Sequence, residues 1–217
     1  MKLTIPFFDD NQRMADLILI TVWGGLTNLQ STFSSTAWDI INKPDLQQTL
    51  DPANKADPTT LSVFDRQEPW IVLRSAMFES IRLCGPITGP ARIVTEAYPL
   101  PSEPSMSIPK GQVLTLSSYH AHRQESAWGP DAATYNPQRF LTEDPPIGTS
   151  RYITWGLNTP HLCPGQWFAW EVIQILTLDL FREYSFKVDH VVEDDDNYKY
   201  SAGNVIWKDI KVKVQKI

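Results

Sequence analysis

Hydrophobic residues recur at intervals of three and four along three stretches of the chain, which is the spacing of one face of an α-helix. These stretches are residues 14 to about 41, 68–84 and 166–184. Shorter apolar runs bounded by turn residues predict strands, at residues 90–94, 112–116, 186–188 and 204–217. The pattern therefore predicts a mainly α fold with small β-sheets, an α+β class.

The first predicted helix contains a glycine pair in its middle. Gly24 and Gly25 are unfavourable inside a helix and call for a reason, such as the close approach of a flat ligand or of another backbone. The alternative is a kinked, buried helix that carries no site.

Cys163 lies in a turn, Cys163-Pro164-Gly165, that leads into the third predicted helix. Backbone N–H groups and the positive end of the helix dipole stabilise a thiolate at such a position. A thiolate is a soft ligand that suits iron. The alternative is a small core cysteine without a ligand role.

The composition limits the function classes. The 217 residues are 42% hydrophobic and 20% charged, which predicts one globular domain over residues 1–217. A net charge of −6 without a Lys/Arg cluster argues against a nucleic-acid partner. Two cysteines make no disulfide framework, and we find no apolar run of membrane-spanning length and no signal peptide.

The segment Trp155-Gly156-Leu157-Asn158, followed by His161-x-Cys163-Pro164-Gly165-x-x-Phe168-Ala169, resembles the haem-binding loop of the cytochrome P450 family, the haem-thiolate monooxygenases. The resemblance implies that Cys163 is the axial ligand of haem b iron and that Trp155 and His161 contact the haem. The segment departs from the family pattern in two ways. Thr159 replaces the usual glycine four residues before the cysteine, and one extra residue separates Trp155 from Cys163.

Two further motifs occur in the family's order. Glu79-x-x-Arg82 resembles its Glu-x-x-Arg motif, and the meander-like segment at 135–140 supplies Arg139, which the resemblance places with Glu79 and Arg82. A lone Glu-x-x-Arg is otherwise a solvated ion pair. Arg92 falls close to where the family has a strand arginine that contacts a haem propionate. Its alternative is an exposed arginine on an edge strand.

Residues 24–28 can be laid on the family's distal-helix signature, small-Gly-x-acid-Thr, which places Gly25 beside the haem. Thr27 and Asn28 then stand at the catalytic positions where the family has an acid and an alcohol that relay protons to bound dioxygen. Asn at the alcohol position also gives a weaker resemblance to the sterol 7α-hydroxylase and prostacyclin synthase branch, which contains hydroxylases and an isomerase.

A zinc site formed by His120, His122, His161 and Cys163 is an alternative for these residues. His-x-His places both rings on one face of a strand, but His161-x-Cys163 has none of the usual zinc-ligand spacings. Polar residues at a strand end are the plainer interpretation of His120 and His122.

Taken together, the resemblance predicts the C-terminal half of the cytochrome P450 fold, with the N-terminal half absent. It implies a monooxygenase that acts on a small lipophilic or secondary-metabolite substrate with electrons from an NADPH-cytochrome reductase. Gln166 stands where the family commonly has a basic residue on the face that docks this reductase. The alternatives are a non-catalytic fragment and a haem-thiolate isomerase that needs no O₂.

The resemblance also bears on location and turnover. The family is usually found at the endoplasmic reticulum membrane, and we expect this chain, in which we find no anchor, to be cytoplasmic or membrane-peripheral. We do not expect the unassisted chain to turn over, because neither Thr27 nor Asn28 is readily ionisable near neutral pH.

Overall fold

The computed structural model describes residues 11–55, 57, 70–86, 89–157, 161–188, 198–201, 204–207 and 212–217. Its helices are α1 (Asn11–Ile41), α2 (Pro44–Lys55), α3 (Trp70–Cys84), α4 (Ser118–Ala121), α5 (Glu125–Trp128) and α6 (Gln166–Glu183). The three long predicted helices are confirmed as α1, α3 and α6. Together with the small sheets, they confirm the predicted α+β class and agree with part of the fold that the resemblance implied.

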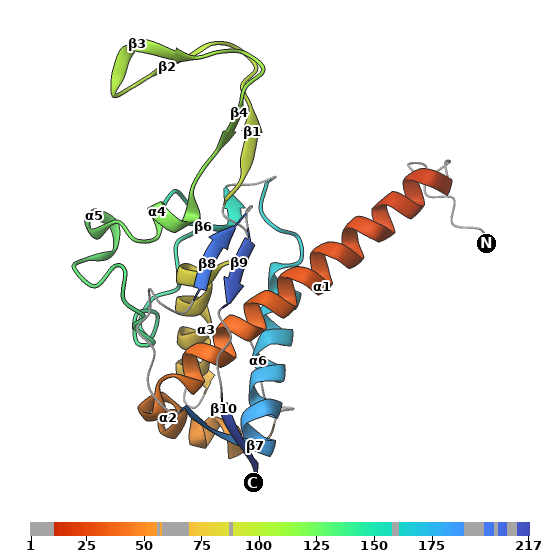
Figure 1. Cartoon of the computed structure of the whole chain (residues 1–217), viewed down its shortest axis with the longest axis vertical. Helices are drawn as coiled ribbons and strands as arrows, with labels where there is room; N and C mark the ends of the chain where they lie inside the picture. Colours follow the sequence, from red (N-terminus) through yellow and green to blue (C-terminus); the bar gives the residue numbers. More distant parts are fainter. Residues whose placement is uncertain are drawn as a thin grey trace.

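The strands pair two by two. The antiparallel pairs are β1 (Ala91–Ile93) with β4 (Val113–Thr115), β2 (Tyr98–Leu100) with β3 (Glu103–Ile108), β7 (Tyr184–Val188) with β10 (Val212–Lys216) and β8 (Tyr198–Ser201) with β9 (Asn204–Trp207). The strands β5 (Ile147–Gly148) and β6 (Tyr152–Leu157) are parallel. The hairpin of β2 and β3 extends the β1–β4 pair into an arm that projects from the helical body (Figure 1).

Helix α3 forms the centre of the core. All its residues except Val72 are buried, because α1, α6 and the loops after α4 pack around it. One apolar cluster joins the C-terminal part of α1 to α2, α3 and α6, and a second joins α3 to α6, β6 and the segment around Trp128 and Phe140. A helix surrounded on all sides is apolar on most of its surface, as this one is except for two serines and three ionic residues, Arg74, Ser75, Glu79, Ser80 and Arg82.

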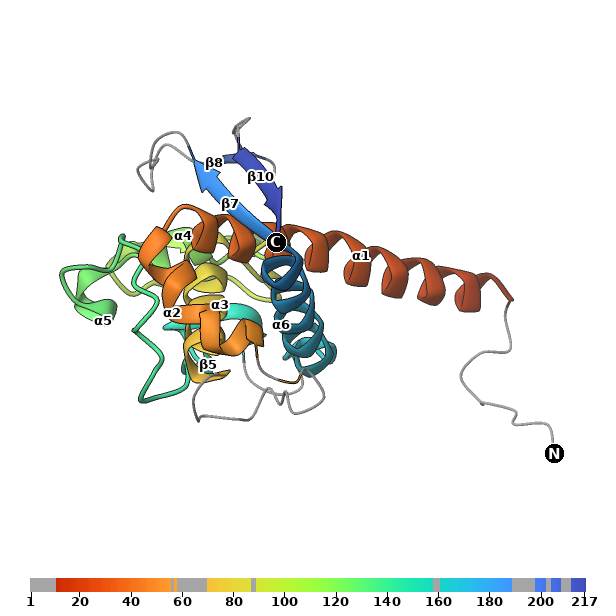
Figure 2. The ribbon, with the colours of Figure 1, turned by 90° about the horizontal axis from the view of Figure 1, so that it is seen from below.

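Helix α1 is divided between the core and solvent. Near its C-terminus Ile40 is fully buried, whereas Leu19 and Leu26 in its N-terminal part are about two-thirds exposed. Figures 1 and 2 show this N-terminal part extending away from the rest of the molecule. The helix continues through Gly24 and Gly25 without a break. None of the described helices has the length and apolar character needed to cross a bilayer.

Candidate functional site

Cys163 lies in the connection between β6 and α6. Its backbone N–H donates to the Trp155 carbonyl at 2.7 Å, and its own carbonyl accepts from the N–H of Gln166, the first residue of α6. The Cys163 thiol is half-buried, whereas the other free cysteine, Cys84, is buried in α3. A half-buried thiol directly before a long helix is what the Cys163-Pro164-Gly165 turn predicts.

Gly156 allows the loop to close against the end of β6. Its φ of +95° lies in the left-handed region, and a Cβ at this position would be 2.2 Å from the His161 carbonyl oxygen. A side chain at position 156 would push residues 161–163 away from Trp155. The His161 side chain itself is exposed. Asn158 and Thr159, where the family pattern is altered, lie outside the described residues.

Three tryptophans pack against one another at the start of α6, Trp155 from β6 and Trp167 and Trp170 from α6 itself. Trp155 meets Trp170 edge to face with ring centroids 6.0 Å apart, and Trp170 meets Trp167 in the same way at 4.6 Å. Gln166 is buried beside them. Gln166 stands where the family commonly has a basic residue on its reductase-docking face, and here its side chain packs inside the fold.

The candidates on α1 lie in its outer part. The position that a Cβ on Gly25 would take has no neighbour within 4 Å, so the helix backbone is open to an approaching group there. Thr27 is exposed and Asn28 is half-buried. The Asn28 carbonyl accepts from the Thr32 hydroxyl at 2.7 Å, inside the helix.

Arg92 is exposed on β1, opposite Leu114 of β4, and its guanidinium donates to the neighbouring Ala91 carbonyl. Within the described ranges, neither Arg92 nor the side chains of Thr27 and Asn28 form a hydrogen bond or ion pair with residues 161–165. The structure thus brings together Trp155 and the His161–Cys163 segment, and it places the remaining candidates on separate elements.

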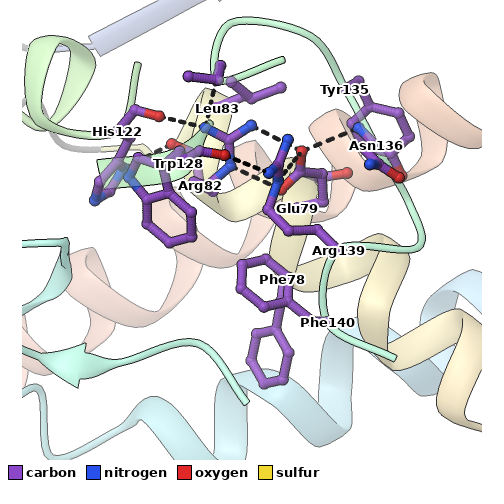
Figure 3. Close-up of polar contacts among 12 residues, drawn as sticks. Phe78, Glu79, Arg82, Leu83, His122, Trp128, Tyr135, Asn136, Arg139 and Phe140 are labelled. Atoms are coloured by element: carbon purple, nitrogen blue, oxygen red, sulfur yellow. Dashed lines mark hydrogen bonds and ion pairs between the residues drawn. The ribbon is translucent and has the colours of Figure 1, made fainter. Parts of the chain in front are cut away.

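Three charged residues of the described part of the chain form a buried polar arrangement, the Glu79 cluster, which we define as Glu79, Arg82 and Arg139 (Figure 3). Arg82 binds Glu79 through two parallel contacts of 2.7 Å, from Nε to Oε2 and from Nη2 to Oε1. Arg139 Nε donates to the same Oε1 at 3.1 Å. Glu79 and Arg82 are almost completely buried, so the predicted three-residue cluster is confirmed and the solvated pair is not found.

The remaining donors of the cluster reach backbone carbonyls. Arg82 Nη1 donates to the Ala132 carbonyl at 2.6 Å and also to the His122 carbonyl, and Arg139 Nη1 donates to the Trp128 carbonyl at 3.0 Å. The backbone N–H of Asn136 also donates a hydrogen bond to Glu79 Oε1 at 3.0 Å. Because buried charges are stable only when they are paired and hydrogen-bonded, these contacts fix the loop at 122–140 against α3.

His122 has a structural role that the sequence did not distinguish from that of His120. It is the C-cap residue of the short helix α4, and the predicted strand at 112–116 ends earlier, as β4. Its Nδ1 donates to the Arg82 carbonyl at 2.7 Å, and its Nε2 accepts from the Ile153 N–H at 3.0 Å. Burial lowers the pKa of His122 to about 4, although the bond to the Arg82 carbonyl acts in the opposite direction. Both nitrogens are engaged in the fold, which removes His122 from the zinc alternative.

Comparison with known proteins adds a family match. The family model described as Cytochrome P450 matches residues 12–215. Cytochrome P450 71A15 of Arabidopsis thaliana is 25% identical over 188 residues, covering 83% of this chain and 37% of that protein. Cytochrome P450 3A12 of Canis lupus familiaris is 26% identical over 191 residues, covering 82% and 36%. The cytochrome P450 monooxygenase ecdH of Aspergillus rugulosus is 28% identical over 123 residues, covering 56% and 24%. The chain thus spans about a quarter to two-fifths of the length of these relatives.

Proposed function

Because the chain belongs to the cytochrome P450 family, which implies a haem-thiolate cofactor, we propose that Cys163 is the axial ligand of haem iron in this protein. The observation that carries the proposal is the contrast between the two cysteines. Cys163 is half-buried in a loop held by the Trp155 carbonyl directly before α6, whereas Cys84 is enclosed in α3. Of the two cysteines, only Cys163 is partly accessible to a cofactor.

The residues that we propose for this site suit a flat, largely apolar ring. The backbone at Gly25 is open to close approach, and Trp23 and Leu26 on the same part of α1 expose more than half of their surface. Beside the thiol, a Cβ at position 165 would lie 3.9 Å from Cys163 Sγ, so Gly165 keeps a side chain away from the sulfur. When bound, haem supplies the electron-transfer and dioxygen chemistry of the family.

The other candidate residues take supporting roles in the proposal. Arg92 and His161, both exposed, supply a guanidinium and an imidazole for the haem propionates. Trp155 holds the loop that presents Cys163. Thr27 and Asn28 offer a hydroxyl and an amide that can orient water but are not readily ionised, so proton delivery at these atoms passes through water.

The activity proposed for the whole protein is oxygen insertion into a small lipophilic substrate, with electrons from an NADPH-cytochrome reductase. Family membership supports the reaction class, and the apolar exposed residues of α1 support the lipophilic character of the substrate. A haem held by Cys163 would receive electron density from the thiolate, the feature that suits such a cofactor to dioxygen chemistry.

The test is a haem titration of the purified chain followed by a reduced CO-difference spectrum. We expect the thiolate–CO form of the Soret band in the parental chain and in Cys84→Ser, and its loss in Cys163→Ser. Circular dichroism checks that each variant keeps its helices. A thiolate spectrum that survives in Cys163→Ser, or that is lost equally in both variants, would contradict the assignment.

A further inference from the structure

The three tryptophans beside the Cys163 loop form a continuous path from that loop to the surface. The Trp155 carbonyl accepts a hydrogen bond from the Cys163 N–H. The Trp155 ring lies at 78° to the ring of Trp170, with ring centroids 6.0 Å apart. Trp170 is 2% exposed and meets Trp167 at 4.6 Å. Trp167 is 48% exposed. Each step is a direct edge-to-face contact, within the usual range for aromatic pairs.

Indole has a chemistry that other core rings lack. With phenol, it is the ring that loses a single electron most readily among common side chains, whereas the phenyl ring resists oxidation. Trp170 also contacts Phe78, with centroids 4.9 Å apart, but a phenyl ring cannot take over the oxidised state from an indole. Among the described residues, the aromatic contacts of Trp170 to other indoles are those with Trp155 and Trp167.

The polar surroundings give the path a direction. The Nε1 atoms of Trp155 and Trp170 are buried, and neither indole N–H donates a hydrogen bond to an acceptor within the described ranges. An oxidised ring at either position therefore keeps its N–H proton and remains a strong oxidant toward its neighbour. Trp167 is half in water, where an oxidised indole can release its proton and become a less oxidising neutral radical. The oxidised state is thus favoured at the outer end.

We propose that Trp155, Trp170 and Trp167 carry single oxidising equivalents outward from the Cys163 loop. A one-electron oxidant formed beside the loop takes an electron from Trp155, Trp170 then reduces Trp155, and Trp167 reduces Trp170. Trp167 loses a proton to water. A soluble thiol then gives Trp167 one hydrogen atom, which restores the indole N–H and leaves a thiyl radical. In the cell, the oxidant would arise at the haem site, so this role rests on the proposed function.

The activity that follows is protective. An oxidant beside Cys163 that is not consumed by substrate would otherwise attack the thiolate, which oxidises readily. Moving the oxidised state to Trp167 places it where soluble reductants can reach it, away from the loop that positions Cys163.

The path can be tested without haem. A ruthenium tris-bipyridine photosensitiser is attached through a maleimide to Cys163 in a Cys84→Ala chain, and a flash with a cobalt(III) electron acceptor leaves the sensitiser one electron short. Transient absorption follows the tryptophanyl radical, and peptide mass spectrometry locates oxidised tryptophan. We expect oxidation to accumulate on Trp167. Trp170→Phe should lower that yield more than about tenfold, which needs an added barrier of only about 1.4 kcal/mol.

Two matched variants complete the test. Trp38→Phe removes a buried tryptophan of the other apolar cluster and should leave the Trp167 yield unchanged. Trp167→Phe changes an exposed ring with little risk to folding and should move oxidation back to Trp170 and Trp155. Equal Trp167 oxidation with and without Trp170, or oxidation confined to Trp155 in the parental chain, would overturn the proposal. Because the photosensitiser replaces haem, a negative result here is independent of whether Cys163 binds haem.

Discussion

His122 joins three parts of the chain through one neutral ring. Its Nδ1–H binds the end of α3 at Arg82, its Nε2 binds the N–H of Ile153 in β6, and its own carbonyl accepts from Arg82. It also stacks on Tyr152, whose hydroxyl donates to the Phe78 carbonyl. This arrangement requires Nε2 without a proton, so the fold depends on the protonation state of a single imidazole.

The free energy of unfolding should therefore decrease as the pH is lowered through a defined window. Burial lowers the pKa of His122 to about 4 from 6.5 in the unfolded chain. Above pH 6.5 both states are neutral at this residue. As the pH falls toward 4, the unfolded state takes up a proton that the folded state refuses, which costs about 3 kcal/mol of unfolding free energy. Urea unfolding at pH 7.0 and 4.5, compared between the parental chain and His122→Gln, measures this contribution.

The neighbouring histidine, His120, provides a control for the urea-unfolding experiment. His120 is exposed, and its Nδ1 lies 2.8 Å from the Ser117 hydroxyl. His120→Gln should keep the parental pH dependence, whereas His122→Gln should be less stable at pH 7.0 and lose less between pH 7.0 and 4.5. If both variants follow the parental curve, His122 does not hold the segments together.

The buried Glu79–Arg82 pair could be predicted from the sequence, whereas the buried position of His122 could not. Glu79 and Arg82 are three apart on one helix, and their motif occurs with a partner arginine at a recognisable distance, so their association could be predicted. His122 could not be distinguished from His120, because its partners are 31 and 40 residues away. Only closure of the chain around α3 shows which of the two rings is enclosed.

At the scale of elements, the Glu79 cluster is the link between α3 and the irregular segment from Trp128 to Phe140. This segment contains little regular secondary structure, so its backbone carbonyls and N–H groups need side-chain partners. Arg82 and Arg139 supply many of these, and the Ser75 hydroxyl accepts from the Phe140 N–H at 2.9 Å. A hydrogen bond from Asn136 and the guanidinium of Arg139 both lower the pKa of Asp131, which keeps this carboxylate charged.

Removing one member of the cluster should destabilise the whole connection. Arg82→Met keeps much of the side-chain volume but leaves Glu79 buried with one guanidinium instead of two, and we expect a loss of about 3–5 kcal/mol. The surface pair of Lys216 and Glu183, 3.6 Å apart and largely exposed, provides the control. Lys216→Met should change the unfolding free energy by less than about 1 kcal/mol.

Chemical denaturation monitored by tryptophan fluorescence gives both values, and soluble yield gives a second measure. If Arg82→Met unfolds at the same denaturant concentration as Lys216→Met, the cluster does not contribute what its burial implies. Arg139→Met, at a partly exposed position, should fall between the two.

Elements with strong apolar periodicity were predicted closely, and those without it were not. The first helix was predicted from residue 14 and begins at Asn11, because its apolar pattern starts later than its hydrogen bonds. The β2–β3 hairpin was not predicted. Its sequence contains Pro99, Pro101 and Pro104 and is almost entirely exposed, so no alternation between a core face and a solvent face marks it.

At the scale of the whole molecule, the protein exposes more surface than its size requires. Its accessible surface is 13,713 Å², whereas a compact monomer of 24.7 kDa has about 10,000 Å². The N-terminal part of α1 and the β1–β4 arm account for many of the exposed large apolar residues, which include Leu19, Trp23, Leu26, Ile93 and Val113. These parts lack the packing that holds the C-terminal part of α1 in the core.

This division of α1 leads to a test within a single helix. Leu26 is 68% exposed and Ile40 is 0% exposed, so the same substitution should act differently at the two positions. Leu26→Lys should change the unfolding free energy by less than about 0.5 kcal/mol, because a lysine there stays in water. Ile40→Lys should cost about 4 kcal/mol or more, because it places an unpaired charge in the core.

Two measurements on the same samples check the prediction. Denaturant unfolding gives the free energies, and small-angle scattering of the parental monomer should give a radius of gyration above about 17 Å, the value for a compact chain of this length. Leu26→Lys should also reduce binding of a hydrophobic dye, because it interrupts the exposed apolar part of α1. A compact radius together with equal destabilisation by Leu26→Lys and Ile40→Lys would mean that the outer part of α1 is packed in solution. In that case the backbone at Gly25 would not be open to the flat cofactor that we propose.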